Sequence, residues 1–315
     1  MPSYLAKRLM VSLVVIFGVT LVAFLAIQFL PSDVVDIMLG LRKTPESAAA
    51  LRAELGLDRP PVEQYLTWMG RILRGDLGIS IRSGEPITDV MRQRLPVTIE
   101  LALLASIIAI LIGVPAGIIA AVRQYSKVDQ VSTVFSMLGL SIPDFWLATM
   151  LILLFSVTWK LMPPGGLWVS PQVDLGQNLK RILMPALSMG LPSAAIYFRI
   201  TRSSMLEVIR SDFIVTAYSK GARESRVIFQ HALKNAFIPV VTMSSLDFTY
   251  LLGGSFIIET IFSLPGLGRA TLESIYERDF ILLQGCLLVY AIMVVLVNIL
   301  LDLVYVWLDP RIRLE

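Results

Sequence analysis

Four acidic residues lie inside or beside long apolar stretches of this sequence: Asp144, Asp247, Glu259 and Asp302. A charged side chain within a membrane is costly, so it normally faces a water-filled cavity or a partner. Asp247 lies in the middle of an apolar run and is therefore our first candidate for a residue on a polar path through the membrane. An equally weighted interpretation is a buried carboxylate, hydrogen-bonded to a neighbouring helix. We add Asp144, Phe145 and Tyr250 to the candidate path residues.

The sequence lacks the common catalytic patterns. No lysine follows a glycine, so a phosphate-binding P-loop is absent, as are His-Glu-x-x-His and Gly-x-Ser-x-Gly. One histidine, His231, and one cysteine, Cys286, argue against a transition-metal site made by this chain alone. His231 could serve proton coupling, but its position beside Lys234 and Asn235 favours a structural role. If ATP is used, another chain must bind it.

The composition indicates a membrane protein. Of the 315 residues, 56% are apolar and 16% are charged, and the mean hydropathy is +0.73. A soluble domain has about 25% charged residues. We therefore predict an all-α, polytopic membrane protein whose residues 1–315 form a single transmembrane domain.

The uncharged stretches predict about six membrane spans. The first holds 22 uncharged residues, roughly 33 Å of helix, and is too long for the apolar core of a cleaved signal peptide. We expect Pro143 to kink the third span, and Pro185 and Pro192 to interrupt the fourth. The six spans are residues 9–30, 101–122, 131–159, 182–200, 236–258 and 280–308.

Two glycine pairs stand out within these spans. Gly113 and Gly117 have the spacing that lets two helices approach closely in lipid, although they could also be incidental glycines in a kinked span. Gly253 and Gly254 would allow close helix contact or local unwinding of the fifth span.

The polar segment 31–100 is predicted to form a small extracytoplasmic cap. Thr44-Pro45-Glu46 opens a run typical of a short helix with proline in its first turn. Gly75-Asp76-Leu77-Gly78 is typical of a turn, as is Pro265-Gly266-Leu267-Gly268 further along the chain.

The basic residues predict the orientation. With the amino terminus inside, the cytosolic segments carry thirteen Lys and Arg, against five in the short outer loops. Cytosolic loops are enriched in Lys and Arg. We therefore expect both termini in the cytosol, and with them the loop 201–235.

The segment 212–239 of that loop has a helix–glycine–helix pattern. Its first helix carries one apolar stripe, with Asp212 as the expected N-cap. Gly221 falls where a left-handed helix end would lie. A second pattern, through Val227, Ile228, Ala232 and Leu233, runs into the fifth span. Two short helices at a membrane surface suit docking to a separate cytosolic protein. The stripe is Phe213, Ile214, Ala217 and Tyr218.

This segment resembles the loop of ATP-binding-cassette (ABC) importer permeases that contacts the ATPase. It keeps Ala217, Gly221 and Leu233 of the family pattern. It departs from that pattern at Val215, Thr216, His231 and Lys234. The string TAYSKG…HALKNAFIPVV is similar to the variant in dipeptide, oligopeptide and nickel permeases. Further matches are Leu30-Pro31-x-Asp33, Ser141-x-Pro143-x-Phe145 and Pro265-Gly-Leu-Gly-Arg269.

The resemblance implies the fold and partners of a type I, binding-protein-dependent importer in the bacterial inner membrane. The partners would be a second permease chain, two ATPase subunits that bind ATP and Mg, an extracytoplasmic binding protein and membrane lipid, with no nucleic acid. The cargo would be peptides or related solutes, or alternatively nickel, a metal chelate or glutathione. The residues expected to contact the ATPase are Asp212, Phe213, Ile214, Ala217, Tyr218, Gly221, Arg223 and Glu224.

Two other classes of protein are weaker alternatives. An ion-coupled secondary transporter would have repeated halves and paired intramembrane charges, and no repeat is visible here. A membrane-embedded enzyme would need a cluster of nucleophile and base or metal ligands, which one histidine and one cysteine do not supply.

Overall fold

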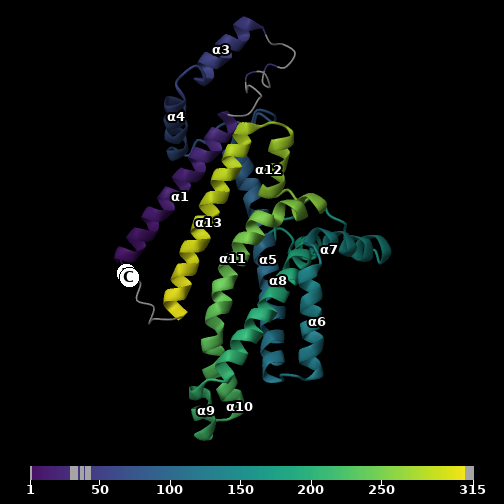
Figure 1. Ribbon diagram of the computed structural model, residues 1–315. Helices are drawn as coiled ribbons and strands as arrows, with labels where there is room; N and C mark the ends of the chain where they lie inside the picture. Colours follow the sequence, from purple (N-terminus) through teal and green to yellow (C-terminus); the bar gives the residue numbers. More distant parts are fainter. Residues whose placement is uncertain (1, 29–34, 36–38, 40–43, 309–315) are drawn as a thin grey trace. The chain divides into compact units, whose positions relative to one another are not determined.

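The computed structural model describes residues 2–28, 35, 39 and 44–308, and within these ranges the chain is all-α, as predicted. An isolated antiparallel bridge joins Ile79 and Pro86. The long helices are α1 (Pro2–Gln28), α5 (Ile87–Val122), α8 (Leu175–Ile209), α11 (Leu233–Ile261) and α13 (Phe280–Leu308) (Figure 1). The shorter helices are α3 (Pro45–Leu55), α4 (Pro61–Leu73), α6 (Lys127–Ser141), α7 (Asp144–Leu151), α9 (Asp212–Ser219), α10 (Glu224–Arg226) and α12 (Leu267–Tyr276). Two π-helical segments, η2 (Ile152–Thr158) and η3 (Val227–Ala232), follow α7 and α10.

The described residues divide into two compact units. The first consists mainly of residues 1–96 and 266–299, and the second mainly of residues 97–265. Helix α5 begins in the first unit and continues into the second. Some positions named from the sequence lie outside the part of the chain that the structure describes. They are Pro31, Asp33, Arg311, Arg313 and the side chain of Asp302.

Aromatic side chains join α1 and α4 in the first unit. Tyr65 of α4 is buried, and its hydroxyl lies 2.9 Å from the hydroxyl of Thr20. The Phe17 and Phe24 rings meet the Tyr65 ring edge-on, with centroids 5.9 and 5.4 Å away. Edge-to-face pairs at this spacing are favourable, so they fix α4 on one face of α1.

The predicted helix start and turn in the polar segment are both present. Ser47 and the Thr44 N-cap exchange hydrogen bonds at the start of α3, with Pro45 in the first turn. In the turn at residues 75–78, the Asp76 carboxylate accepts from the Gly78 N–H at 2.9 Å. The Arg71 guanidinium donates to the same carboxyl and lowers the pKa of Asp76.

Helix α8 runs unbroken through Pro185 and Pro192, so the predicted interruption of the fourth span is wrong. Each proline removes one backbone donor, but packing against α6, α7 and α11 holds the helix straight enough to continue. The Ser188 hydroxyl donates to the carbonyl oxygen of Pro185 at 2.7 Å. Tertiary contacts therefore outweigh the local preference of proline.

Three glycines bring α5 and α8 into close contact. A Cβ atom on Gly113 would come within 2.4 Å of the Ala194 carbonyl oxygen, and one on Gly117 within 2.7 Å of Thr201 Cβ. On the opposite side of the interface, a Cβ on Gly190 would lie 2.7 Å from the Ala105 carbonyl oxygen. Of the two interpretations of the Gly113–Gly117 pair, the structure supports close helix contact.

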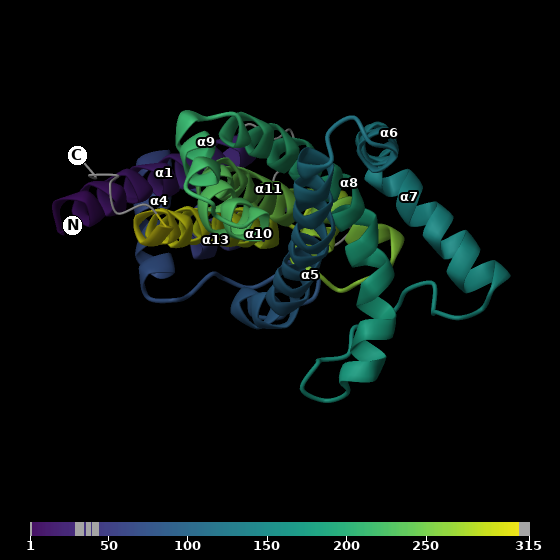
Figure 2. The same cartoon turned by 90° about the horizontal axis from the view of Figure 1, so that it is seen from below.

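The predicted kink at Pro143 is a sharp bend. Helix α6 ends at Ser141, Pro143 caps α7, and the two parts of the broken helix meet at 100°. Figures 1 and 2 both show α7 turning away from the axis of α6. Because residue 142 precedes a proline, it takes an extended conformation, which separates the two helices.

Other predicted boundaries also change. Helix α5 begins at Ile87, so the helix that contains the expected second span starts within the segment 31–100 assigned to the cap. Gly266 is the N-cap of α12, so the expected turn at Pro265–Gly268 is the start of a helix. Helix α11 is unbroken at Gly253 and Gly254, and a Cβ on Gly253 would meet nothing within 4 Å.

Three described helices are long and apolar enough to cross a membrane: Ile87–Val122, Glu224–Ile261 and Phe280–Leu300. The bent pair Lys127–Ser141 and Asp144–Thr158 would be a fourth, and Met10–Leu25 is a shorter apolar helix. Helix α8, the expected fourth span, is outside this set. Its buried face includes Asn178, Ser188 and Ser193, because it packs on protein and so needs less apolar surface.

We predict that Gly117→Val destabilises the chain. The new side chain would strike Thr201 and the Phe198 carbonyl oxygen, because a Cβ alone comes within 2.7 and 2.8 Å of them. Overpacking of this kind costs about 1–3 kcal/mol, measurable as earlier thermal unfolding in detergent. Gly253→Ala is the matched control, with equal or higher stability expected; equal stability of both variants would contradict the close contact.

Candidate functional site

The loop between α8 and α11 folds into two short helical pieces. Helix α9 begins at Asp212, but its N-cap is Ser211, so the predicted N-cap is wrong by one residue. Gly221 follows α9 with a φ of 76°, the left-handed conformation expected there. Helix α10 and η3 then lead without a break into α11. Figure 1 shows α9 and α10 at the shared end of α8 and α11.

This loop has its own apolar core, which we call the loop core. It consists of the buried residues Ala121, Met205, Ile214, Val227, Ala232 and Ala236. These residues come from α5, α8, α9, η3 and α11. The core therefore connects the loop directly to the ends of three long helices.

The loop core divides the predicted apolar stripe. Ile214 is 1% exposed and Ala217 packs partly against the same core. Phe213 and Tyr218 are 47% and 46% exposed, one on each side of the buried residues. The stripe is thus only partly buried, and its two aromatic side chains are the exposed part. Arg223 and Glu224 are exposed at the start of α10.

Two exposed apolar residues of the loop were missed in the sequence. Val215 is 56% exposed and Phe229 is 60% exposed. Both fall outside the stripe because a periodic pattern reveals a buried face and says little about apolar residues on the other side. His231 lies in η3, where its carbonyl oxygen accepts from the Asn235 side chain at 2.8 Å.

An ion pair beside the loop core was also missed. Arg202 of α8 donates two hydrogen bonds to Asp129 of α6, at 2.6 and 2.9 Å. The Asp129 side chain is 4% exposed and also accepts from the Tyr125 N–H at 2.9 Å. This bidentate pair holds the turn between α5 and α6 against α8. The two residues are 73 positions apart, so no sequence pattern indicates it.

Asp247 lies between α11 and α8. It is 5% exposed, and the Ser193 hydroxyl donates to its Oδ1 at 2.8 Å. The carboxylate also interacts with the buried hydroxyl of Tyr197 on α8. This geometry matches the second interpretation from the sequence, a carboxylate buried against a neighbouring helix, and the pathway role stays a prediction.

The remaining pathway candidates lie on α7 and α11. Phe145 is 48% exposed and Tyr250 is 63% exposed. The carboxylates of Asp144 and Asp247 both act electrostatically on the Tyr250 phenol. The structure thus brings the four candidates into one neighbourhood where α7 packs against α11.

Glu259, the third acidic residue singled out, is fully buried near the end of α11. Its Oε1 accepts from the hydroxyls of Thr98 and Ser255, at 2.7 and 2.9 Å. It therefore joins α11 to α5. In the part of the chain that the structure describes, no group of three His, Cys, Asp or Glu side chains is placed to hold a metal ion.

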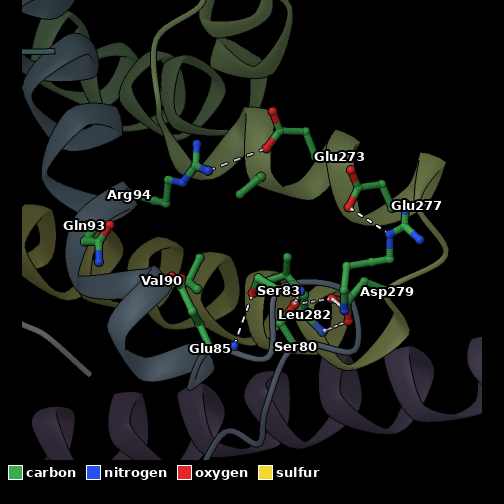
Figure 3. Close-up of a pocket in the computed structure, with 12 residues that line it drawn as sticks. Ser80, Ser83, Glu85, Val90, Gln93, Arg94, Glu273, Glu277, Asp279 and Leu282 are labelled. Carbon is green, nitrogen blue, oxygen red and sulfur yellow. Dashed lines mark hydrogen bonds and ion pairs between the residues drawn. The ribbon is translucent and has the colours of Figure 1, made fainter. Parts of the chain in front are cut away.

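A polar cavity of about 150 Å³ lies in the first unit. Its walls come from residues 80–85, the start of α5, α12 and the start of α13 (Figure 3). Charged side chains of both signs line it, and Asp279 lies at its base. No sequence pattern indicated this cavity, because Ser80 and Asp279 are 199 positions apart.

Two family profiles cover almost the whole chain. Residues 113–314 match "Binding-protein-dependent transport system inner membrane component", and residues 1–102 match the amino-terminal part of such membrane components. The chain belongs to this family of inner membrane permease components.

Two named relatives are similar in sequence to this chain over nearly their full length. The chain is 35% identical over 315 residues to the oligopeptide transport system permease protein AppB of Bacillus subtilis (strain 168), covering 99% of this chain and 100% of that protein. It is 40% identical over 337 residues to the dipeptide transport system permease protein DppB of Escherichia coli (strain K12), covering 99% of each.

Solved structures share the fold. The MetNI methionine ABC transporter in an inward-facing conformation has a TM-score of 0.56 at 16% identity, covering 70% of this chain and 96% of that chain. An amino acid ABC transporter with histidines has a TM-score of 0.52 at 17% identity, covering 69% and 93%. At this identity the match concerns the fold alone, which is that of ABC importer permeases.

We predict that Arg202→Gln destabilises the second unit. It would leave the Asp129 carboxylate buried without its charged partner; breaking such a pair costs about 3 kcal/mol. Unfolding by heat in detergent would measure the loss. Arg199→Gln, at an exposed position on the same helix, is the control and should unfold like the parent chain.

Proposed function

We propose that this chain is the permease subunit of an ATP-driven importer whose cargo is peptides. The observation that carries the proposal is its similarity, over 99% of its length, to relatives named as oligopeptide and dipeptide permeases. The chain forms half of the translocation pathway, and a second, similar permease forms the other half. Two ATPase subunits bind ATP and Mg, and an extracytoplasmic binding protein delivers the cargo.

The membrane arrangement follows the basic residues. Six spans cross the bilayer, and both termini and the loop between α8 and α11 lie in the cytosol. Seven Lys and Arg in residues 199–234 support this orientation. Residues 79–86 and α12 then lie on the extracytoplasmic side.

Coupling to the ATPase rests on the loop core. Phe213 and Tyr218 enter a groove of the ATPase, a helix-in-groove contact, with Arg223 and Glu224 at its rim. Because Ile214 is in one apolar cluster with residues of α5, α8 and α11, movement of α9 is carried into the long helices. ATP shifts the permease between states only if the ATPase binds those states differently.

The cargo pathway runs along α7 and α11. Phe145 and Tyr250 present exposed aromatic surface there. Asp144 and Asp247 supply negative charge near the Tyr250 phenol, which favours the positive amino group of a peptide.

The first experiment is purification of this chain from native membranes, followed by an ATPase assay. A co-purifying ATPase pair and a second permease, with hydrolysis stimulated by a loaded binding protein, would support the proposal. A chain that purifies alone and transports peptides under an ion gradient would refute it.

We predict that Phe213→Ala with Tyr218→Ala reduces ATPase association without unfolding the chain. Both side chains are about half exposed, so their loss removes partner contact and little core. Ile214→Ala is the contrasting variant, because it opens a cavity in the loop core and should cost about 2–4 kcal/mol of stability. ATPase co-purification and thermal unfolding measure the two effects; unchanged ATPase association in the double variant would contradict the docking role.

We predict that Asp247→Asn lowers peptide transport severalfold, because it removes a negative charge from the proposed pathway. Uptake into liposomes holding the complete complex measures this, and Ser193→Ala serves as the control for loss of the hydrogen bond alone. Transport by Asp247→Asn equal to that of the parent complex across a range of pH would assign Asp247 to helix packing instead.

A further inference from the structure

The cavity in the first unit is too small for a whole peptide. Its volume is about 150 Å³, whereas sites for complete small molecules usually measure about 300–1,000 Å³. It could hold a few water molecules or the end of one long side chain. The occupant to consider is therefore part of a larger molecule.

The base of the cavity is rigid. Asp279 is fully buried, and its Oδ2 accepts from the Ser80 hydroxyl at 2.5 Å and from the Arg82 N–H at 3.3 Å. Its Oδ1 accepts from the Leu282 N–H at 3.1 Å, at the start of α13. These bonds hold residues 80–82 against α13, so Asp279 positions the cavity wall.

The upper walls carry charges in loose pairs (Figure 3). Arg82 lies 3.7 Å from Glu277, and Arg94 lies 3.6 Å from Glu273. Both separations exceed hydrogen-bonding distance, and the Arg82 and Glu277 side chains are at least half exposed. Such pairs contribute little stability, so an incoming charge can replace one partner.

The lining favours a positive occupant. It contains two guanidinium groups, from Arg82 and Arg94, against four carboxylates. The carboxylates belong to Glu85, Glu273, Glu277 and Asp279. Arg269 also donates to Glu273, at 2.7 Å, which leaves Glu277 as the more accessible carboxylate.

Chain connectivity indicates the side of the membrane. In the six-span arrangement with a cytosolic amino terminus, the segment before α5 and the segment between α11 and α13 both lie outside the cytosol. The cavity is lined by residues 80–94 and 270–282, which belong to or adjoin these two segments. In that arrangement, the cavity is extracytoplasmic.

The rim indicates a protein partner. Tyr276, next to Glu277 at the end of α12, is 83% exposed, and Ile275 is 51% exposed. Exposed aromatic side chains beside a pocket are common anchors of protein interfaces.

We propose that this cavity receives a lysine or arginine side chain of the extracytoplasmic binding protein, with Tyr276 as the neighbouring anchor. This inference rests on the proposed function and deepens it by naming the docking contact. The incoming cation replaces Arg82 beside Glu277. Docking thereby exchanges a loose internal ion pair for one across the interface.

The test uses the complete importer in lipid nanodiscs and a fluorescently labelled binding protein. The Kd of the binding protein for the importer is measured at low and high salt, with and without peptide. Glu273→Gln with Glu277→Gln should weaken docking about five- to tenfold at low salt and flatten its salt dependence. Tyr276→Ala should weaken docking about fivefold or more at both salt concentrations.

The matched control is Asp89→Asn. Asp89 is an exposed acid of α5 that pairs loosely with Arg92 at 3.3 Å, outside the cavity lining. The Kd of the binding protein for the Asp89→Asn complex should stay within about twofold of the value for the parent complex, as expected for an exposed pair. Three outcomes would overturn the cavity proposal. The Asp89→Asn control could weaken docking as much as the double variant does, the double variant could dock as tightly as the parent complex or more tightly, or docking could weaken only when peptide is bound.

Basal ATP hydrolysis and subunit co-purification separate the two proposals. If the parent complex contains the ATPase and binds the binding protein, and the cavity variants bind it equally, only the docking contact fails. If the parent chain brings no ATPase, the proposed function itself fails.

Discussion

The close contact between α5 and α8 is the constraint on which the second unit depends. In lipid there is little hydrophobic gain when two helices meet, so association relies on van der Waals packing and short-range polar contacts. Gly113, Gly117 and Gly190 let the two backbones approach closely enough for that packing. Because side chains at these positions would strike backbone carbonyl oxygens, the contact admits one register. Helix α8, fixed in this way, then presents its other faces to α6, α7 and α11.

The loop between α8 and α11 extends this contact beyond the apolar part of the helices. Ala121, one helical turn beyond Gly117, and Met205, one turn beyond Thr201, both belong to the loop core. The Asp129–Arg202 pair, next to Thr201, adds α6 to the same assembly. A force on α9 therefore meets a packed cluster of five elements and not a flexible loop. Interiors packed at this density transmit displacement with little compression.

The buried carboxylates of α11 accept hydrogen bonds from hydroxyl groups. Asp247 is bonded by Ser193, and Glu259 by Thr98 and Ser255. Hydroxyl donors satisfy part of a carboxylate's bonding without adding a second charge to an apolar region. Ser193 lies on α8, whose buried face also includes Asn178 and Ser188, and these polar residues explain why α8 is less apolar than a span that faces lipid. A high apolar content is needed where a helix contacts lipid. Helix α8 contacts other helices of the protein instead, so it can span the membrane with a lower apolar content.

The sequence predicted features that depend on a few neighbouring residues. The start of α3 after Thr44, with Pro45 in its first turn, and the left-handed Gly221 follow from local backbone chemistry. Local backbone chemistry did not predict that α8 continues through Pro185 and Pro192, because its contacts with helices distant in the sequence keep it helical. The Asp129–Arg202 pair and the Ser80–Asp279 bond join residues 73 and 199 positions apart, and a single sequence carries no signal for them.

The apolar stripe of α9 shows where a periodic pattern stops being informative. A stripe shows that one helix face is buried, but it does not show whether the chain itself or a partner buries it. Here Ile214 is covered by the chain's own residues, and Phe213 and Tyr218 remain about half exposed beside it. This division suits a coupling element, because a helix that moved only with the ATPase could not pull on the membrane spans. In the proposed coupling, one face of α9 stays attached to the permease while Phe213 and Tyr218 contact the ATPase.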